Sequence, residues 1–449
     1  MRRFLTLLIA ASLAGCGNES GLEGPAQCTN DNEKQYVLDA LYYWYLWNDL
    51  LPPGIDIADY PSPEVLVREV TQTYGPQKPE GGALDRFSFV GSAQADQQFF
   101  GEGKYEGFGF TYRLEAGQMH FTQIYADSPV DLANFSRGQT VLRIDGLTIT
   151  AGTTRADVSA ALGPGTVEFE IENLDLTTFT AMVTEDIVTI NPIPQYRTIA
   201  MGDGEPPVGY MEFATFISTA HDNQGGNDFN DVFSTFIAAG VEDVIIDLRY
   251  NRGGLVDTAN LLADHLGGFN NDGQIFSNTE FNADRSSNND IQYFANRANT
   301  IDLNRLIIIA SSDDTASASE LVTNGLDPFV TGGVYIVGEN TFGKPVGQIG
   351  LEFCGKILRP TTFKKSNAAG FGDYFDGLPV DCAVADDYSI PVGDASDPNV
   401  IAALSYIQGA GCPAPAAAPQ NGVQQPDFLL DSQSSDLWGP PEREFAGAF

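Results

Sequence analysis

The sequence of 449 residues is long enough for two or three domains, and its hydrophobic content of 43% indicates a globular protein with a substantial buried core. It carries 60 acidic residues against 23 Lys and Arg, which gives a formal net charge of −37. Binding to nucleic acid or to anionic lipid depends on clustered Lys and Arg, so this balance argues against both kinds of partner. The acidic charge itself favours solubility and says nothing about a substrate.

The N-terminus has the composition of an export signal. Arg2 and Arg3 precede an apolar run that is too short to span a bilayer, and the run ends in Leu-Ala-Gly directly before Cys16. Small residues before a cysteine resemble the lipobox of bacterial lipoproteins, whose cysteine is lipidated. We expect a signal peptide over residues 1–15, a lipid-anchored linker over 16–30, and an exported lipoprotein in the periplasm or at the outer membrane. An ordinary secretory signal is the alternative.

Four further cysteines, Cys28, Cys354, Cys382 and Cys412, form an even set that export would place in an oxidising compartment. We therefore expect two disulfides. Cys354 with Cys382 is the more local pairing and leaves Cys28 to join Cys412, but this is a hypothesis because four cysteines allow three pairings. Their spacing lacks the C-x2-C form of a zinc site, and the chain has three histidines, so we expect no metal and no cofactor.

Two helical segments are expected near the N-terminus. Residues 36–51 repeat bulky apolar side chains at helical spacing and end before two prolines, and residues 63–74 follow with a second helical pattern. The aromatic side chains of the first segment are best explained as packing residues. Together the two segments predict a small helical N-terminal region over residues 31–98.

From residue 99 to residue 190 the sequence changes to short alternating segments separated by glycine turns, which is typical of β-strands. A Ser-Pro turn, a short helical piece and a strand follow one another in residues 125–146. This order resembles a PDZ domain, and Gly107, Phe108, Gly109 and Phe110 resemble its carboxylate-binding loop, whose backbone N–H groups hold the end of a peptide. A generic β-rich domain is the alternative, because a G-x-G pattern alone is weakly specific.

Strands and helices alternate through residues 191–412. Strands are expected in VGYMEFATF, VEDVIIDLRY, RLIIIA and VYIVG, and helices in DFNDVFSTFIAAG, TANLLADHLG and SASELVTNGL. This alternation favours an α/β domain with mainly parallel strands. Residues 413–449 are rich in Pro, Ala and Gln and are expected to form a disordered tail. The apolar residues 445–449 could enter the PDZ-like groove, or the tail could be inert.

A serine lies at the junction of one such strand and helix. Ser317 follows the strand RLIIIA and the loop SSDDTA, at the start of a predicted helix. The first turn of a helix offers unpaired N–H groups and a positive dipole, which suits an attacking hydroxyl with an oxyanion site at the N–H of Ala318. The alternative is purely structural, because serine is a common N-cap.

A nucleophilic serine needs a base, and histidine is the usual one. His120, His221 and His265 lie in unpromising contexts, and the patterns G-x-S-x-G, S-x-x-K and H-E-x-x-H are absent. Lys344, in GENTFGKPVGQ, is the remaining candidate, since burial could lower its pKa from about 10.4 and leave the amine neutral. Gln348 follows four residues later and could orient that amine.

Three motifs together, D-L-R-Y-N-R-G-G, T-A-S-A-S-E and G-E-N-T-F-G-K-P-V-G-Q, resemble those of the C-terminal processing (tail-specific) serine peptidases. The resemblance extends over residues 36–405. It implies a multidomain α+β protein in which a crotonase-like α/β catalytic domain carries an inserted PDZ-like β domain and a small helical N-terminal region. The site residues that it implies are a Ser317 nucleophile, a Lys344 base, Gln348 and Glu320 as supporting groups, and an oxyanion site at Gly253, Gly254 and Ala318.

The chain departs from the family pattern in three places. Pro345 follows the lysine where glycine is usual, and Arg252 stands where proline is common. The spacing of 27 residues from Ser317 to Lys344 is slightly long. None of these departures removes a catalytic group, although Pro345 fixes φ beside the base.

The sequence therefore predicts an exported serine endopeptidase with a Ser-Lys dyad that cleaves protein or peptide substrates near their C-termini. A lipid anchor would hold it to a membrane, no nucleic-acid partner is expected, and the oligomeric state is not predicted. A catalytically idle PDZ-type scaffold is one alternative. An enzyme that uses Ser319 as its nucleophile, with Ser317 as a helix cap, is another.

Overall fold

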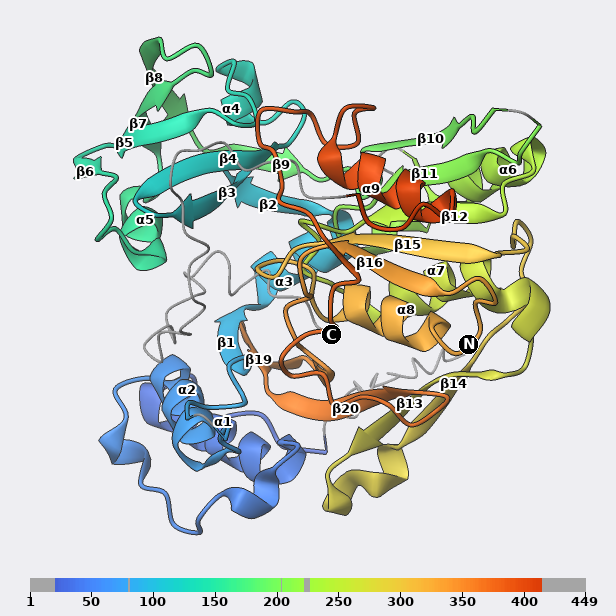
Figure 1. Cartoon of the computed structure of the whole chain (residues 1–449). Helices are drawn as coiled ribbons and strands as arrows, with labels where there is room; N and C mark the ends of the chain where they lie inside the picture. Colours follow the sequence, from blue (N-terminus) through green and yellow to red (C-terminus); the bar gives the residue numbers. More distant parts are fainter. Residues whose placement is uncertain (1–20, 80, 203, 222–226, 414–449) are drawn as a thin grey trace, which may run out of the picture.

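The computed structural model describes residues 21–79, 81–202, 204–221 and 227–413. The expected signal peptide, the lipidation site Cys16 and the tail beyond residue 413 lie outside these ranges. Figure 1 shows a helical region (residues 21–92) at the lower left, a β domain (residues 93–190) at the upper left and a larger sheet domain (residues 191–413) on the right. Within the described ranges, no helix has both the length and the apolar character needed to cross a membrane.

The helical region contains α1 (Asn30–Trp44) and α2 (Pro63–Tyr74), with the 3-10 turns η1 (Asn48–Leu50) and η2 (Ile57–Asp59) between them. The hydroxyls of Thr29 and Ser62 cap the two helices, and α2 has the predicted bounds. The first helix begins before residue 36 because Thr29 caps it there. It ends at Trp44 because the N–H of Leu46 donates to the carbonyl of Thr361 (2.9 Å) instead of continuing the helix.

Strands from the second half of the chain complete this region. β1 (Phe89–Ser92) pairs with β19 (Lys356–Arg359), which pairs with β18 (Leu351–Phe353), and both pairings are antiparallel. Leu351, Phe353 and Leu358 pack in one cluster with the buried side chains of α1 and α2. Burial of this apolar surface holds the helical region against the sheet domain.

The β domain begins with α3 (Ala93–Glu102) and continues as an antiparallel sheet in the order β3-β4-β5-β7-β8, with β6 beside β5. The bounds are β3 (Phe110–Glu115), β4 (Gln118–Ile124), α4 (Pro129–Leu132), β5 (Thr140–Ile144), β6 (Leu147–Thr148), α5 (Arg155–Ala161), β7 (Thr166–Glu172) and β8 (Thr178–Thr184). β2 (Lys104–Gly107) and β9 (Asp186–Thr189) form a separate pair. Phe108, Phe121 and Phe169 lie in the core of this domain.

The sheet domain is built on a mainly parallel sheet in the order β10-β11-β12-β15-β16-β21. Its strands are β10 (Gln195–Ile199), which is antiparallel to its neighbour, and the parallel strands β11 (Val208–Glu212), β12 (Asp243–Asp247), β15 (Arg305–Ala310), β16 (Val334–Gly338) and β21 (Cys382–Ala383). Ile246 and Ile308 pack against α6 (Phe229–Ala239), α7 (Val256–Asn271) and α8 (Ala318–Leu326). Ile245 and Ile307 pack against α9 (Pro398–Ile407) on the other face. Two covered faces explain why these strands are continuous apolar runs in the sequence.

A second, antiparallel sheet of the same domain was not predicted. Its order is β14 (Asp290–Tyr293), β13 (Ile275–Phe281), β20 (Thr361–Asn367) and β17 (Val346–Gln348), and the turns η3 (Ser218–Ala220) and η4 (Ala283–Asn288) lie outside both sheets. Figure 1 shows β13 and β20 below α8, across from the parallel sheet. The end of β17 carries Gln348, so this sheet positions one of the predicted site residues.

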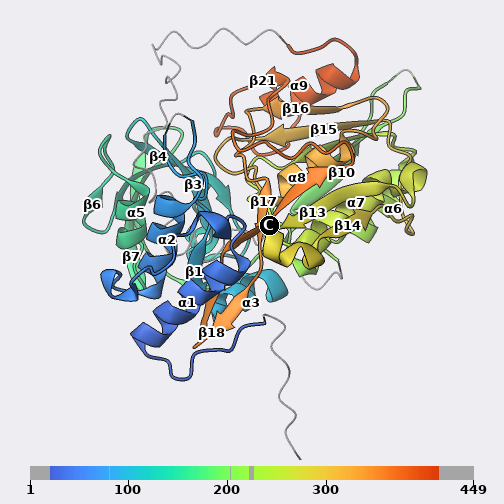
Figure 2. The same ribbon diagram turned by 90° about the horizontal axis from the view of Figure 1, so that it is seen from below.

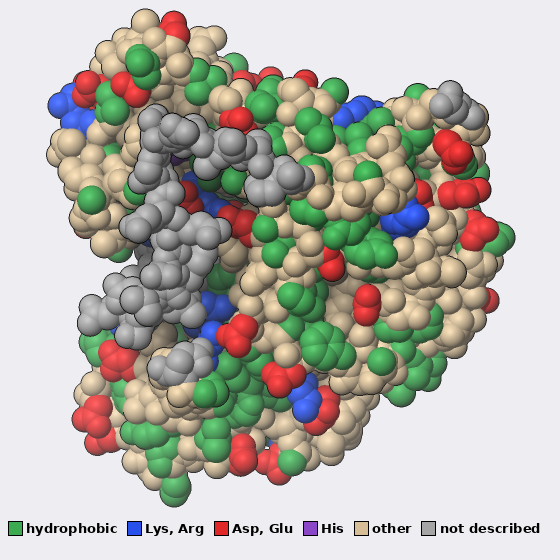
Figure 3. All heavy atoms as spheres, viewed as in Figure 1, with side chains coloured by type: hydrophobic (Ala, Val, Ile, Leu, Met, Phe, Trp, Pro, Cys, Tyr) green, Lys and Arg blue, Asp and Glu red, His purple; other side chains and the backbone are tan. Residues whose placement is uncertain are grey.

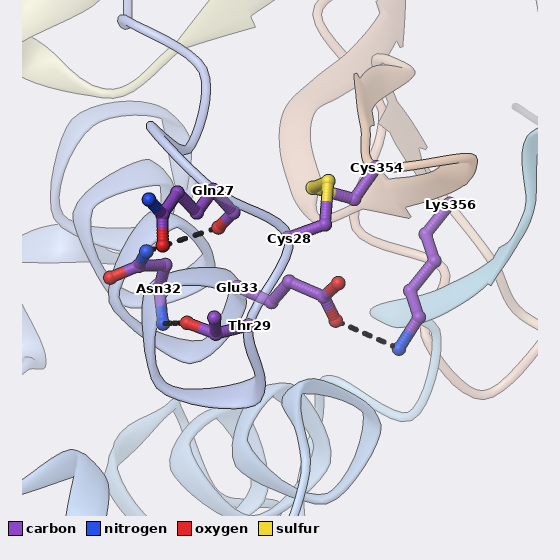
Figure 4. The surroundings of a disulfide bond; sticks show 7 residues. All are labelled: Gln27, Cys28, Thr29, Asn32, Glu33, Cys354 and Lys356. Atoms are coloured by element: carbon purple, nitrogen blue, oxygen red, sulfur yellow. Dashed lines mark hydrogen bonds and ion pairs between the residues drawn. A yellow bond between two sulfur atoms is a disulfide. The ribbon is translucent and has the colours of Figure 1, made fainter.

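The predicted disulfide pairing is wrong. The bonds join Cys28 to Cys354 and Cys382 to Cys412, with Cα–Cα distances of 5.5 and 5.3 Å. Cys354 lies in the turn between β18 and β19. This turn packs on α1, and Cys28 lies just before the start of that helix. An ion pair between Glu33 and Lys356 (3.1 Å) lies beside the disulfide (Figure 4). Cys382 and the chain after α9 meet because α9 covers the face of the sheet that carries β21. Tertiary packing, rather than proximity in the sequence, decides the pairing.

The surface reflects the acidic composition. On the face drawn in Figure 3, Asp and Glu side chains are widely spread, and the Lys and Arg side chains of the described residues form only small groups. Some arginines are instead buried in ion pairs. Arg249 contacts Asp247 (2.7 Å) and Asp397 (2.6 Å), and Arg359 contacts Asp96 (2.6 Å). These buried arginines add no positive surface for a phosphate-rich partner.

Candidate active site

Ser317 lies where the parallel strand β15 leads into α8, as the sequence predicts. Its side chain is 0% exposed, and its backbone has φ +64°, a value that residues other than glycine rarely adopt. The hydroxyl has no hydrogen-bond partner within the described part of the chain. Ser317 therefore occupies the N-cap position of α8 without using its hydroxyl as a cap, and that oxygen is left for another role.

Ser319 has a different environment. Its Oγ donates to the backbone carbonyl of Asn251 (3.0 Å), and the side chain is fully buried. The hydroxyl thus joins α8 to the loop after β12. This contact gives the Ser319 hydroxyl a structural partner, which the hydroxyl of Ser317 lacks.

Lys344 and Gln348 are brought together. The amine Nζ of Lys344 donates to Oε1 of Gln348 (2.9 Å), and the lysine side chain is 4% exposed. Nε2 of Gln348 donates to the carbonyls of Phe87 (2.8 Å) and Arg359 (2.7 Å), so the amide is fixed with its oxygen toward the amine. Burial and, to a smaller extent, the Arg359 charge lower the pKa of Lys344 to about 7, although the charges of Asp85 and Glu320 oppose the shift.

The segment Asp85-Arg86-Phe87-Ser88 forms the turn that presents Phe87 to this amide. The buried carboxylate of Asp85 accepts from the N–H groups of Phe87 (2.9 Å) and Ser88 (3.1 Å) and from the hydroxyl of Thr361 (3.0 Å). The Lys344 amine lies 5.5 Å from the centre of the Phe87 ring. The role of Asp85 as the organiser of this turn becomes visible only in the structure.

Glu320 joins the serine to the lysine segment. Its carboxylate accepts from the N–H groups of Ser317 (2.8 Å), Gly343 (2.7 Å) and Lys344 (2.8 Å) and from the hydroxyl of Thr341 (2.5 Å). Burial raises the pKa of Glu320, while these donors oppose the rise. Sequence reasoning missed Thr341. Its position three residues before Lys344 in GENTFGK is the only signal that could have found it.

Two glycines of the turn after β12 approach Ser317. They have φ values of +92° (Gly253) and +139° (Gly254), and a Cβ on Gly253 would lie 2.7 Å from the Cβ of Ser317. Only glycine fits there. The N–H of Gly253 donates to Oδ1 of Asn251 (2.9 Å), a residue that the sequence analysis did not single out. The N–H groups of Gly254 and Ala318 have no acceptor among the described residues, so these two are the available oxyanion donors.

The three departures from the family pattern leave this site intact. The carbonyl of Pro345 accepts from the N–H of Lys365 (2.9 Å), which joins the segment after the lysine to β20. Arg252 pairs with Asp314 (2.7 Å) in the loop before Ser317. Residues 327–333 connect α8 to β16 within the spacing of 27 residues between Ser317 and Lys344.

The predicted loop of residues 107–110 lies apart from Ser317, at the start of β3. It borders a cavity of about 230 Å³ whose opposite wall includes Arg252 and Gly253. The cavity therefore lies between the predicted peptide-binding loop and the glycine turn. One group of potential metal ligands occurs in the described ranges, Cys28, Glu33 and Cys354, and its two thiols are joined as a disulfide.

Two family models match the chain. The model described as Peptidase family S41 matches residues 207–372, and that described as Peptidase S41 N-terminal domain matches residues 32–89. The chain belongs to peptidase family S41. The first match includes the glycine turn, Ser317, Lys344 and Gln348, and the second includes most of α1, all of α2 and the turn at Asp85.

Two curated proteases are similar to the chain at low identity. A carboxy-terminal-processing protease of Bartonella bacilliformis is 26% identical over 265 residues, which cover 56% of this chain and 56% of the relative. A probable CtpA-like serine protease of Staphylococcus haemolyticus is 24% identical over 294 residues, which cover 63% of this chain and 53% of the relative. The chain thus spans about half the length of the curated relatives it matches.

Solved structures of family S41 share the fold. A Bacteroides fragilis protein described as an S41 protease superposes with a TM-score of 0.63 at 21% identity, covering 84% of this chain and 97% of that chain. The photosystem II D1 C-terminal processing protease superposes with a TM-score of 0.52 at 18% identity, covering 80% and 94%. These likenesses agree with the predicted multidomain fold of mixed α and β structure.

Proposed function

We propose that the protein is an exported serine endopeptidase that works through a Ser317–Lys344 dyad and an acyl-enzyme. The observation that carries the proposal is the buried amine of Lys344, which is oriented by Gln348 and has a lowered pKa. The Glu320 carboxylate accepts from the backbone N–H groups of both Ser317 and Lys344, and the hydroxyl of Ser317 has no hydrogen-bond partner among the described residues. A serine with an uncommitted hydroxyl and an amine that can be neutral are the parts that nucleophilic catalysis without histidine requires.

In the proposed reaction, neutral Lys344 takes the proton of Ser317 as Oγ attacks the peptide carbonyl carbon. The N–H groups of Gly254 and Ala318 would stabilise the negative oxygen of the tetrahedral intermediate. Lys344 then gives its proton to the leaving amine, the C–N bond breaks, and an ester to Ser317 remains. Water hydrolyses this ester with Lys344 again as the base, which regenerates both residues.

The proposal also gives roles to the β domain and to the N-terminus. The loop of residues 107–110 in the PDZ-like β domain would hold a substrate's terminal carboxylate, so cleavage would occur near protein C-termini. Export with a lipid on Cys16 would keep the enzyme at a membrane surface and would supply the oxidising compartment that two disulfides need.

The pH dependence of the reaction follows from Lys344. Because only the neutral amine can accept a proton, and its pKa is about 7, kcat/KM should be low in acid, rise through about pH 7 and then level off. Initial rates of peptide cleavage from about pH 5 to about pH 9 measure this profile. A rate that still rises about tenfold per pH unit at pH 9, as the ordinary lysine pKa of about 10.4 would give, would contradict the assignment.

The proposal is tested by reacting the purified protein with an unstructured protein substrate and, separately, with a fluorophosphonate probe that labels activated serines. We expect cleavage, mapped by mass spectrometry to sites near the substrate's C-terminus, and a label on the peptide that contains Ser317. Binding of tail peptides with neither cleavage nor label would instead support the idle scaffold. A label on Ser319 would move the nucleophile to that residue.

A further inference from the structure

Arg359 ends β19 and contacts the candidate site through its backbone. Its carbonyl accepts from Nε2 of Gln348 (2.7 Å), and Oε1 of the same amide accepts from the amine of Lys344 (2.9 Å). One side-chain amide therefore lies between the backbone of Arg359 and the proposed base. Because the contact is made by a backbone carbonyl, a substitution of the side chain leaves it in place, and the two parts of the residue can be tested separately.

The side chain of Arg359 is fixed by one face of α3. Its Nε and Nη2 donate to Oδ1 and Oδ2 of Asp96, both at 2.6 Å, and the guanidinium carbon lies 5.2 Å from the centre of the Phe100 ring. Asp96 and Phe100 are four residues apart in this helix and therefore share a face. Two parallel hydrogen bonds from a planar guanidinium define its orientation as well as its position.

This ion pair is buried beside the segment of Gln348. Arg359 is 7% exposed and Asp96 is 8% exposed. A Cβ placed on Gly350, two residues after Gln348, would lie 3.6 Å from Nη2 of Arg359. Buried charges are screened much less than surface charges, so this guanidinium acts on neighbouring titratable groups more strongly than an exposed arginine would.

The helix that holds the guanidinium is itself anchored at both ends. β1 pairs with β19 and leads directly into α3, as Figure 1 and Figure 2 show, and the N–H of Ala93 donates to the carbonyl of Gly355 (3.1 Å). Near the other end, the hydroxyl of Ser218 in the sheet domain donates to the carbonyl of Gly101 (2.8 Å). The positive charge of Arg359 is therefore held at a defined place in the interior.

Charged groups from three segments face the amine of Lys344. Arg359 in β19 lowers the pKa of this amine, whereas Asp85, before β1, and Glu320, in α8, raise it. Burial acts in the same direction as Arg359 and has the larger effect. Among the described residues, Asp96 is not one of the charged groups that shift this pKa, so pairing with Asp96 fixes the guanidinium without cancelling its effect on the amine.

We infer that Arg359 is a positioning residue of the dyad: its carbonyl orients Gln348 toward the amine, and its guanidinium, held by Asp96 and Phe100, presents a fixed positive charge that favours the neutral form of Lys344. The inference rests on the proposed Ser-Lys function. It adds a residue outside the recognised motifs on which the activity of the base near neutral pH depends.

The charge is tested with Arg359→Gln and Arg359→Lys in the full-length protein. Both variants keep the backbone carbonyl and lose the paired hydrogen bonds to Asp96, but only the glutamine variant loses the positive charge. NMR titration of isotope-labelled lysine, with the Lys344 signal assigned from the spectrum of Lys344→Met, gives the pKa of this amine without a substrate. We expect the pKa to rise by about 0.5 or more in Arg359→Gln and to stay within about 0.2 of the wild type in Arg359→Lys.

Two further variants exclude indirect effects. The double variant Asp96→Asn/Arg359→Gln leaves no unpaired carboxylate, so it tests the charge even if Arg359→Gln alone does not fold, and the pKa of Lys344 should again be raised. Lys356→Gln is the matched control, because it removes a positive charge from the same strand whose side chain pairs with α1 and α2. In this control the pKa of Lys344 should stay within about 0.2 of the wild type. Urea unfolding shows which variants are folded.

The pH profile of cleavage is the second readout. In Arg359→Gln the midpoint of kcat/KM should rise with the pKa, so that cleavage at about pH 6 falls by about 3-fold or more while the plateau at high pH changes little. An unchanged pKa in the folded glutamine variants, or an equal rise in Arg359→Lys, would overturn the inference and leave the dyad standing. A raised pKa in Arg359→Gln, together with a wild type that neither cleaves protein nor reacts with the fluorophosphonate, would defeat the proposed peptidase and keep the positioning role.

Discussion

Replacing Ser317 by alanine is expected to lower peptide cleavage by about 10⁴-fold or more, because the step that forms the acyl-enzyme loses its nucleophile. Lys344→Met should cause a loss of similar size, since it keeps an apolar side chain of similar length and removes the only base proposed for Ser317. The two losses should not add in the double variant, because both remove the same step. Initial rates with an unstructured protein substrate measure all three variants.

Ser319→Ala is the matched control for the nucleophile. Its hydroxyl donates to Asn251 and takes no part in the proposed reaction, so cleavage should stay within a few-fold of the wild-type rate. Urea unfolding separates catalysis from folding: Lys344→Met should be at least as stable as the wild type, since it removes a buried amine whose charged form burial disfavours. Full activity of Ser317→Ala, or loss of activity only in Ser319→Ala, would assign the reaction to the other serine.

Glu320→Ala is expected to lower the free energy of unfolding by about 3–5 kcal/mol, because it leaves three buried N–H groups without an acceptor. Thr341→Val removes one of the donors to the same carboxylate and should cost less, about 1–2 kcal/mol. Both variants should also reduce cleavage, because the Glu320 carboxylate holds the backbone of Ser317 beside the segment that carries Lys344. Urea denaturation with the linear extrapolation measures the stabilities.

Glu242→Gln is a suitable control, because Glu242 is exposed and its side chain has no hydrogen bond or ion pair within the described residues. Its stability should stay within about 0.5 kcal/mol of the wild type. If Glu320→Ala were as stable as this control, the carboxylate would not be the link between the serine and the lysine segment.

The local patterns of the sequence were sufficient for α2 and for the buried strands of the parallel sheet. The bounds of α2 follow from Ser62 and Pro63, and the apolar runs that became β12 and β15 are buried on both faces as their composition predicts. Ser317, Lys344 and Gln348 could be selected because each lies in a recognisable short motif. The hydrogen bonds between Glu320 and residues 341–344 could not be predicted from a short stretch of sequence, because they depend on how α8 packs against the segment after β16.

Long-range packing accounts for what the sequence did not reveal. The pairing of Cys28 with Cys354 depends on a β-turn that packs beneath α1, and that contact has no trace in the spacing of cysteines. The second sheet escaped prediction because β17, β18 and β19 are short and resemble loop sequence. The hydrogen bond from the Gly253 N–H to the Asn251 side chain was likewise not predicted. The motif D-L-R-Y-N-R-G-G was recognised as a whole, and its letters do not show how the side chains within it are oriented.

The hydrogen bonds that Gln348 donates to the carbonyls of Phe87 and Arg359 have a consequence for biosynthesis. Phe87 precedes Gln348 by 261 positions, and Arg359 follows it by 11. Because a nascent chain emerges N-terminus first, Ser317 is translated before the lysine, the glutamine and the strand that orients them. The arrangement of Lys344 and Gln348 seen in the folded chain therefore cannot be complete until residues near 359 have been made.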